Sequence, residues 1–261
     1  MVKATIIIAF YKRLDFLRLL LDGLDHQTFK EFEIIIAEDN NAIETKAFLE
    51  NAIEKYSYPI FHVYQEDIGF RKNKILNAAV KIAHSDKLIF LDGDCIPHPK
   101  LVQSYFRLIQ KGKFYYARRV MLSEAFSTKI IKNNQYSFNF FELIYNKCKQ
   151  LRDALYLPFV VPVLKENRDI WGCNWGVSKD DLLKINGFDE DYETAGYGED
   201  IDVTWRLRAT GVKLFAIRQR AIVYHIYHKE NYNQAALDKS KALFDTKKWN
   251  GNWYCKNGIN K

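Results

Sequence analysis

The chain has 261 residues, 48% of them hydrophobic and 27% charged, with a formal net charge of +7 and a pI near 9.0. These values fit a soluble protein with a sizeable core, and the basic excess points to an anionic partner such as a nucleotide, a nucleic acid or an acidic membrane surface. The four cysteines are scattered with no Cys-x-x-Cys pair, which argues against a zinc cluster or a disulfide framework.

The N-terminal residues show no secretory pattern, because they run straight into a strand-like sequence at residues 4–10. The longest apolar stretch, residues 155–164, is interrupted by Pro158 and Pro162 and is far shorter than the roughly 20 residues that cross a bilayer. Together with the scattered cysteines, this predicts a cytoplasmic protein, with peripheral attachment to the inner membrane face as the open alternative.

The first third of the chain alternates between apolar, β-branched runs and segments with helical spacing. From the first strand to the fourth, the expected elements are strand 5–10, helix 13–27, strand 32–39, helix 44–56, strand 60–66, helix 72–84 and strand 87–92. This β-α-β-α-β-α-β order predicts an α/β, Rossmann-like fold with a mostly parallel central sheet flanked by helices. Ligands of such sheets bind beyond the carboxyl ends of the strands.

The pattern changes at about residue 123. Residues 123–168 are aromatic and basic, with a helix expected in their middle, which indicates an insertion rather than another β-α unit. After it we expect strand 173–179, helices 180–187 and 199–211, strands 212–218 and 221–228, and a polar helix at about 233–247. The absence of a repeat or linker pattern in the sequence predicts one domain over 1–261, with halves at 1–122 and 169–261 around the insertion.

Two carboxylates, Asp92 and Asp94, end the fourth expected strand and are separated only by Gly93. Carboxylate oxygens suit Mg²⁺ or Mn²⁺, and two of them leave coordination positions for substrate phosphates. An ordinary turn is the alternative, because Asp-Gly is a common turn dipeptide. The position at the end of a strand in an α/β series favours the metal site.

Other residues near the same expected edge suit a nucleotide. Asp39 follows the second strand, where it can accept a hydrogen bond from a base or a ribose or can cap the next helix. Arg71, Lys72 and Lys74 begin a helix, where cations and backbone N–H groups suit a diphosphate. A solvated helix face is the alternative for these cations.

The second half carries an acidic, glycine-containing loop and two late histidines. Glu199 and Asp200 begin an amphipathic helix, where a carboxylate serves either as a helix cap or, facing a cleft, as a general base. His225 and His228 end a strand, and one of them offers a further protein ligand beside the aspartate pair. A purely structural histidine is the alternative there.

Four motifs in this order resemble glycosyltransferases of family 2 with the GT-A fold: LDGDCIPHP, NWGVSKDDLLKINGFDE, GYGEDIDVTWRL and YHIYHKEN. The C-terminal half resembles the galactosyltransferase-like segment of chondroitin-polymerase-type and β-1,4-galactosyltransferase enzymes. The resemblance covers nearly the whole chain except residues 123–168 and the last dozen. An Asp-x-Asp motif alone is a weak signal, whereas four motifs in the family's order are a strong one.

The resemblance implies a role for each matching position. It implies that Asp92, Asp94 and His225 hold Mn²⁺ or Mg²⁺, with His228 replacing or joining His225. It implies Asp200 as the catalytic base with Glu199 beside it. The nucleotide-sugar site that it implies consists of Phe10, Tyr11, Arg13, Asp39, Arg71, Asp92, Gly93, Asp94, Asn174 and Trp175. The first two loops, AFYKR and AEDN, depart from the family's Pro-x-Tyr-Asn and Asp-Asp-Gly-Ser patterns, so contacts to the base follow less directly than the metal site.

The resemblance also implies a reaction. An inverting enzyme of this kind moves a hexose or N-acetylhexosamine from a nucleotide sugar, for which we expect UDP, to a hydroxyl of a glycan or lipid-linked glycan in surface polysaccharide or lipooligosaccharide synthesis. A nucleotidyltransferase is less consistent with the sequence, which has no glycine-rich phosphate loop. A non-catalytic carbohydrate- or membrane-binding protein on the same scaffold stays open as the alternative.

Two further expectations concern partners. No recognition motif supports nucleic-acid binding, so we expect none. The aromatic rings of the insertion, interleaved with lysines, predict either contact with an anionic membrane surface or an acceptor wall packed on the sheet.

Overall fold

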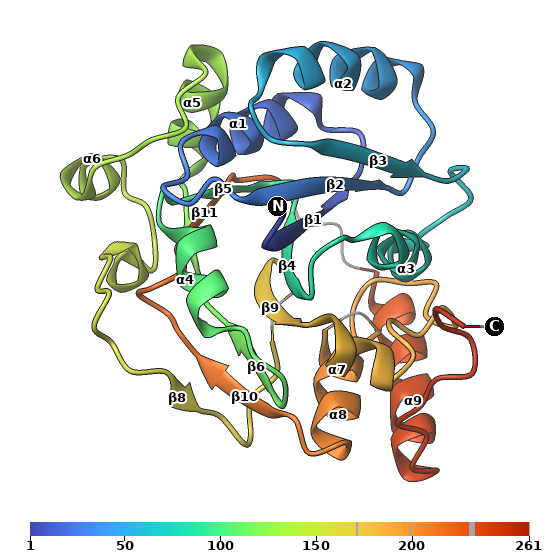
Figure 1. Ribbon diagram of the computed structural model, residues 1–261. Coiled ribbons are helices and arrows are strands. Elements are labelled where there is room, and N and C mark those ends of the chain that lie inside the picture. The colour runs from blue at the N-terminus through green and yellow to red at the C-terminus, as the bar shows by residue number, and fades with distance from the viewer. Residues whose placement is uncertain (171, 199, 230–232, 261) are drawn as a thin grey trace.

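The computed structural model of the protein describes residues 1–170, 172–198, 200–229 and 233–260. In this part of the chain, eight strands form a central sheet and three form a smaller one (Figure 1). The central sheet has the order β3 (Ile60–Tyr64), β2 (Phe32–Glu38), β1 (Ala4–Phe10), β4 (Lys87–Asp92), β9 (Asn174–Ser178), β6 (Lys113–Tyr116), β10 (Lys213–Ala216) and β8 (Val163–Leu164). The smaller sheet has the order β5 (Cys95–Pro97), β11 (Val223–His225) and β7 (Arg119–Met121).

The central sheet is mixed but mostly parallel, which confirms the fold class expected from the sequence. Strands β1 to β4 pair in parallel with one another, as do β6 and β10. Strand β9 runs antiparallel between β4 and β6, and β8 runs antiparallel beside β10 at the edge. The carboxyl ends of β1, β2, β4, β6 and β10 therefore lie along one edge of the sheet, which we call the carboxyl edge.

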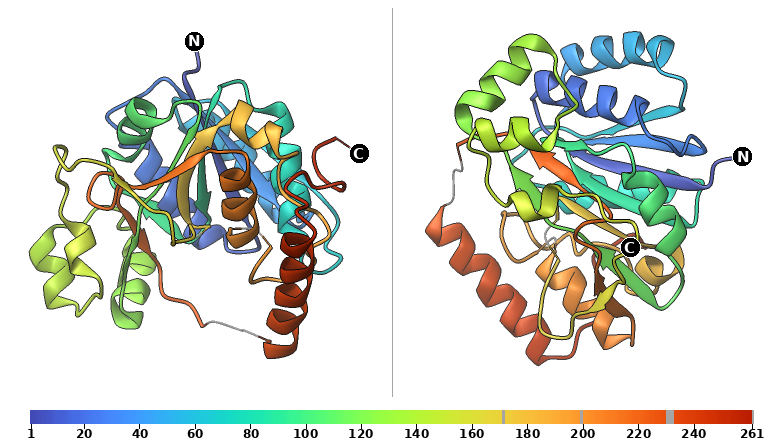
Figure 2. Two further views of the ribbon diagram at one scale, coloured as in Figure 1. Left: turned by 90° about the horizontal axis from the view of Figure 1, so that it is seen from below. Right: turned by 90° about the vertical axis from the view of Figure 1, so that its left-hand side faces the viewer.

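Helices cover both faces of the central sheet (Figures 1 and 2). The helices of the described residues are α1 (Leu14–Asp25), α2 (Ile43–Lys55), α3 (Lys72–Ile82), α4 (Leu101–Leu108), α5 (Glu124–Asn133), α6 (Phe140–Tyr145), the 3-10 helix η1 (Leu151–Ala154), α7 (Lys179–Lys184), α8 (Ile201–Ala209) and α9 (Gln234–Trp249). Side chains of α1, α2 and α4 pack on one face, and those of α3, α7 and α8 on the other. The layered arrangement matches the alternating pattern of the sequence.

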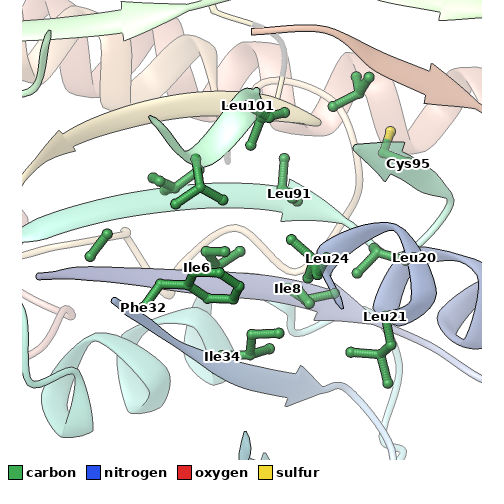
Figure 3. Packing of buried hydrophobic residues seen from close by; sticks show 14 of the residues in the cluster. Ile6, Ile8, Leu20, Leu21, Leu24, Phe32, Ile34, Leu91, Cys95 and Leu101 are labelled. Carbon is green, nitrogen blue, oxygen red and sulfur yellow. The ribbon is translucent and has the colours of Figure 1, made fainter. Parts of the chain in front are cut away.

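The consecutive isoleucines of β1 show why the strand is apolar throughout. Successive side chains of a strand point to opposite faces, so Ile6 and Ile8 join the core under α1 while Ile7 joins the core under α3. Figure 3 shows the first of these cores, where Leu20 and Leu24 of α1 lie against β1. A strand covered by helices on both faces has no solvent side that would favour polar residues.

The insertion has more structure than the single central helix expected from its sequence. Residues 123–168 contain α5, α6 and η1, and β8 joins the edge of the central sheet. Phe126 and Leu143 are buried against the smaller sheet, and Phe138 packs edge-on to Tyr224 of β11 with ring centroids 4.9 Å apart. Part of the aromatic set is therefore core, not surface.

No helix in the described ranges is both long enough and apolar enough to cross a bilayer.

A buried ion pair within α8 is part of a network that connects this helix to the loop before it. Arg206 Nε lies 2.6 Å from Asp202 Oδ2, and neither side chain is exposed. The same guanidinium donates to the carbonyl oxygens of Ile185 and Gly187, and Tyr192 donates its hydroxyl to Asp202. This network ties α8, which follows Asp200, to residues 185–192.

We expect Asp202→Asn to lower the free energy of unfolding by about 3 kcal/mol or more, because it leaves a buried guanidinium without its countercharge. Urea denaturation followed by circular dichroism measures the loss. Asp245→Asn removes one partner of the exposed pair Lys241–Asp245, also spaced i,i+4, and should leave the midpoint nearly unchanged. Equal midpoints for the two variants would contradict a stabilising role for the buried pair.

Candidate metal and nucleotide site

The turn after β4 is tight because it passes close to the end of β1. The N–H of Gly93 donates to the carbonyl oxygen of Ala9 at 2.9 Å. A β-carbon at position 93 would lie 3.1 Å from that oxygen and 3.3 Å from the ring of Phe10. Glycine lets the turn sit this close, and the chain then continues through Asp94 into β5.

Asp94 meets two histidines from the far end of the chain. Strand β11 pairs with β5 so that His225 lies opposite Cys95, and the N–H of Ile226 donates to the backbone oxygen of Asp94. Asp94 Oδ2 lies 3.2 Å from Nε2 of His225 and 3.0 Å from Nε2 of His228. Burial would raise the pKa of Asp94, but hydrogen bonds with the two histidines hold it well below its ordinary value.

These three side chains fit a divalent cation. One carboxylate oxygen and two imidazole nitrogens lie within 4.8 Å of one another. Ligands about 2.1 Å from an octahedral ion are separated by about 3 Å at neighbouring positions, which is close to the spacing found here. Imidazole nitrogen suits Mn²⁺ better than Mg²⁺, which prefers an all-oxygen set. Nδ1 of the buried His225 has no hydrogen-bond partner among the described residues.

Asp92 points to a different partner. Its Oδ1 lies 2.8 Å from Nζ of Lys72, the first residue of α3, and both side chains are largely buried. A small hollow beside this pair is lined by Ala9, Lys72, Leu76, Phe90, Leu91, Asp92, Gly172, Trp175 and Phe188. The structure therefore brings Asp94, His225 and His228 together and sets Asp92 beside a lysine.

Asp39 is engaged at the start of α3. Its Oδ2 accepts from the backbone N–H of Arg71 at 2.8 Å, and its Oδ1 accepts from Nε2 of Gln65 at 2.6 Å. The guanidinium of Arg71 donates to the backbone oxygen of Glu66. Asp39, which directly follows β2, thus caps the start of α3. The sequence had instead offered Asp39 as a cap for α2, the next helix along the chain.

The loop after β1 holds three predicted nucleotide residues in different environments. Phe10 is buried, and its carbonyl oxygen accepts from the N–H of Asp39. Tyr11 is half exposed and donates its hydroxyl to Asp67, which also pairs with Lys12. Arg13 pairs with Asp15 and lies 3.6 Å over the ring of Phe16. Tyr11 is the ring of this loop that solvent can reach.

Asn174 and Trp175 lie in β9, inside the core. Asn174 is fully buried, accepts a hydrogen bond from the Tyr105 hydroxyl and donates to the Ala221 carbonyl oxygen. Trp175 stacks on Phe90 with ring centroids 4.3 Å apart and lines the hollow beside Asp92. Both hydrogen bonds of the Asn174 side chain are made inside the core. Of the two residues, Trp175 is therefore the one that borders the hollow beside Asp92.

Asp200 caps the start of α8. Its Oδ1 accepts from the N–H of Ile201 at 2.8 Å, and its Oδ2 accepts from the N–H of Gly172 at 3.1 Å. Gly172 lines the hollow that Asp92 and Lys72 also line, so the predicted base is hydrogen-bonded to a residue of that hollow. Glu199 lies outside the described residues.

Sequence reasoning missed two features of this site. It gave the first lysine of GFRKNK no role distinct from its neighbours, although Lys72 is the cation that reaches Asp92. It also did not assign Gln65, which shares Asp39 with Arg71. The position at a helix start indicated that Arg71, Lys72 and Lys74 lie near the site. Only the helical geometry of α3 decides which of these three side chains faces it.

Sequence comparisons place the chain among glycosyltransferases. The glycosyl transferase family 2 pattern matches residues 5–181, and the pattern described as the N-terminal domain of galactosyltransferase matches residues 163–229. A validoxylamine A glucosyltransferase of Streptomyces hygroscopicus subsp. jinggangensis is 23% identical over 236 residues, which cover 82% of this chain and 53% of that protein. The chondroitin synthase of Escherichia coli is 27% identical over 270 residues, which cover 90% of this chain and 37% of that protein. The chain thus spans about half, or less, of the length of these curated relatives.

Solved structures share the fold. The mannosyltransferase PcManGT from Pyrobaculum calidifontis, in complex with GDP-Man and Mn²⁺, superposes with a TM-score of 0.64 at 13% identity, covering 95% of this chain and 64% of that one. GalNAc-T7 with UDP, GalNAc and Mn²⁺ superposes with a TM-score of 0.62 at 13% identity, covering 97% and 50%. The fold is therefore that of GT-A glycosyltransferases. With a family pattern matched over residues 5–181, the chain belongs to glycosyl transferase family 2.

Proposed function

We propose that this protein is a metal-dependent, inverting glycosyltransferase that moves a hexose or N-acetylhexosamine from a nucleotide sugar to a hydroxyl of a glycan. The observation that carries the proposal is the cluster of Asp94, His225 and His228 at the carboxyl edge of a family 2 chain. Asp92, two residues before Asp94, pairs with Lys72, and the diphosphate of a donor would bring its negative charge to this turn.

The donor side consists of a cation, a lysine and a capped helix. When bound, Mn²⁺ would supply charge neutralisation for the departing diphosphate. Lys72 adds a fixed positive charge, and the N-terminus of α3 adds backbone N–H groups. UDP is the nucleotide we propose, with Asp39 and Tyr11 near its base and ribose. The complexes of GalNAc-T7 with UDP and of PcManGT with GDP-Man, both with Mn²⁺, support this class of donor.

Asp200 is the general base of the proposed reaction. Its carboxylate accepts N–H groups from Gly172 and Ile201, which orient it and favour its ionised form. It would take the proton of the acceptor hydroxyl while that oxygen attacks the anomeric carbon from the face opposite the diphosphate. One displacement inverts the anomeric configuration, so an α-linked donor yields a β-glycoside.

For the acceptor, we propose a glycan or lipid-linked glycan in surface polysaccharide or lipooligosaccharide synthesis. The similarity to chondroitin synthase supports a polysaccharide acceptor. We further propose that residues 1–261 act as one catalytic domain, in which residues 1–122 bind the donor, residues 169–261 supply the base, and the insertion at 123–168 faces the acceptor.

A screen of UDP- and GDP-sugars with short glycan acceptors tests the proposed function. Release of nucleoside diphosphate in the presence of Mn²⁺ identifies the donor, and proton NMR of the product reads its anomeric configuration. A β-product from an α-linked donor is expected. A retained configuration would contradict the single displacement, and a lack of turnover with every donor would favour the non-catalytic alternative.

Lys72 gives a sharper test of the donor side. Lys72→Met should weaken UDP binding in Mn²⁺ roughly 10- to 100-fold, because a charge-assisted hydrogen bond to phosphate is worth about 1.5–3 kcal/mol. Lys74→Met, on the exposed side of the same helix, is the matched control and should bind UDP as the wild type does. Isothermal titration calorimetry measures both. Equal affinities for the two variants would remove Lys72 from the diphosphate site.

A further inference from the structure

Residues 155–164 expose a row of apolar side chains. Leu155, Leu157, Phe159, Val161 and Val163 are all exposed, and Phe159 and Val161 show 93% and 75% of their surface. The segment turns at Leu157–Val160, where the N–H of Val160 donates to the carbonyl oxygen of Leu157, and this turn carries the strongly exposed ring of Phe159. We call these five side chains the apolar row.

The segment that carries the apolar row is attached to the fold near both of its ends. Tyr156 stacks on His98 with ring centroids 5.2 Å apart, and the N–H of Leu157 donates to the Gln219 carbonyl oxygen. Val163 and Leu164 form β8 and pair with β10. The exposure of the apolar row is thus built into a paired and stacked segment.

Helix α6, which contacts η1 just before this segment, carries further exposed apolar side chains. Phe141 and Tyr145, spaced i,i+4 on one face of the helix, are both strongly exposed. The yellow-green and yellow segment that carries α6, η1 and β8 runs down the left side of Figure 1 and faces the viewer in the right-hand view of Figure 2. Several exposed apolar side chains within one part of a chain are a feature of interaction surfaces.

Cations precede and follow the apolar row in the sequence. Over residues 141–168 they are Lys147, Lys149, Arg152, Lys165 and Arg168, against the acids Glu142, Asp153 and Glu166. Asp153 is buried and paired with Arg218. Lys147, Lys149 and Arg152 are exposed. Apolar groups bordered by cations complement an interface of acyl chains and anionic headgroups.

Two features argue against a protein strand or a second copy as the occupant. Pro158 and Pro162 lack the N–H groups that a strand added along this segment would pair with. A two-fold contact between copies would bring the same cations face to face.

We propose that the apolar row and the exposed face of α6 attach the protein to an anionic lipid surface. Val163 lies opposite Ala216 at the carboxyl end of β10, so this surface lies at the same edge of the sheet as the metal cluster. A lipid-linked acceptor would then be presented to the edge where the donor binds. That last step rests on the proposed function, whereas the binding to lipid does not.

Co-sedimentation with vesicles tests the attachment. Wild-type protein should sediment with phosphatidylglycerol-containing vesicles at low salt and much less with pure phosphatidylcholine. The double variant Phe159→Ser/Val161→Ser should lose at least about tenfold in partitioning, because it removes two apolar groups that would enter the lipid. Lys147→Gln/Lys149→Gln should weaken binding and reduce its sensitivity to salt. Ile53→Ser, at an exposed isoleucine of α2, is the matched control and should sediment as the wild type does.

The outcomes separate this inference from the proposed function. Wild-type protein that ignores anionic vesicles, or binds them equally after Phe159→Ser/Val161→Ser, overturns the attachment. A dimer seen by light scattering that the same double variant dissociates also overturns it, in favour of a second copy. UDP binding in Mn²⁺, measured on each variant, reports on the donor site alone and should stay unchanged.

Discussion

We expect Asp94→Asn to abolish the binding of UDP in Mn²⁺ while the protein stays folded. Oδ2 of Asp94 is the atom on which both imidazoles converge, so the substitution removes the anionic ligand around which the cation site is built. An amide has the same shape as the carboxylate, and the turn that holds it depends on Gly93 and the backbone of Ala9. Calorimetric titration with UDP and thermal melting measure the two properties on one preparation.

The matched control for this change is Asp180→Asn. Asp180 is exposed, lies at the opposite edge of the sheet and pairs with Lys111. It should bind UDP with wild-type affinity. Unchanged affinity in Asp94→Asn, or an equal loss in both variants, would remove Asp94 from the metal site.

We expect Asp200→Asn to lose turnover by a factor on the order of 10²–10⁴ and to keep its affinity for the donor. Asparagine is as good an N-cap as aspartate, so the start of α8 should hold. What the substitution removes is the basic oxygen that would accept the acceptor's proton. This single variant therefore distinguishes the capping role of Asp200 from its role as a general base.

Steady-state kinetics with the identified donor measure this loss. The fall should appear in kcat rather than in the KM for donor, and the melting temperature should stay close to that of the wild type. Near wild-type turnover in Asp200→Asn would reduce Asp200 to a helix cap.

The first four strands and the helices between them could be predicted because each has a single, uninterrupted period. The run Ile6–Phe10 is apolar at every position, and the leucines of α1 recur at helical spacing. The ends of some elements differ from the predicted ends where a capping side chain sets the first helical residue. The sequence predicts a helix from residue 199, whereas α8 begins at Ile201 because Asp200 caps it.

The sequence predicted which residues belong to the candidate site better than it predicted which of them lie together. The resemblance implied Asp92, Asp94 and His225 as metal ligands, with His228 open. The structure gathers Asp94 with both histidines because β11 pairs with β5, a contact between residues far apart in the chain. Asp92 belongs to the end of β4, and Asp94 to the turn beyond it, so spacing alone could not tell that they point to different partners.

In the insertion, the sequence likewise could not predict which side chains are buried and which are exposed. Composition alone did not separate its buried rings from its exposed ones, and Phe126 went to the core while Phe141 stayed outside. The stretch 155–164 was notable in sequence for its prolines and for being too short to cross a bilayer. Its outward apolar row becomes visible only when Tyr156 is seen packed on His98.

The central claim is that turnover of a nucleotide sugar at this edge of the sheet needs a divalent cation. One sample assayed for nucleoside diphosphate release before chelation, after EDTA, and after excess Mn²⁺ tests it most directly. We predict that activity disappears with EDTA and returns with Mn²⁺, and that Mg²⁺ restores less of it because two of the ligands are imidazoles. Activity that persists unchanged after complete chelation would contradict the account.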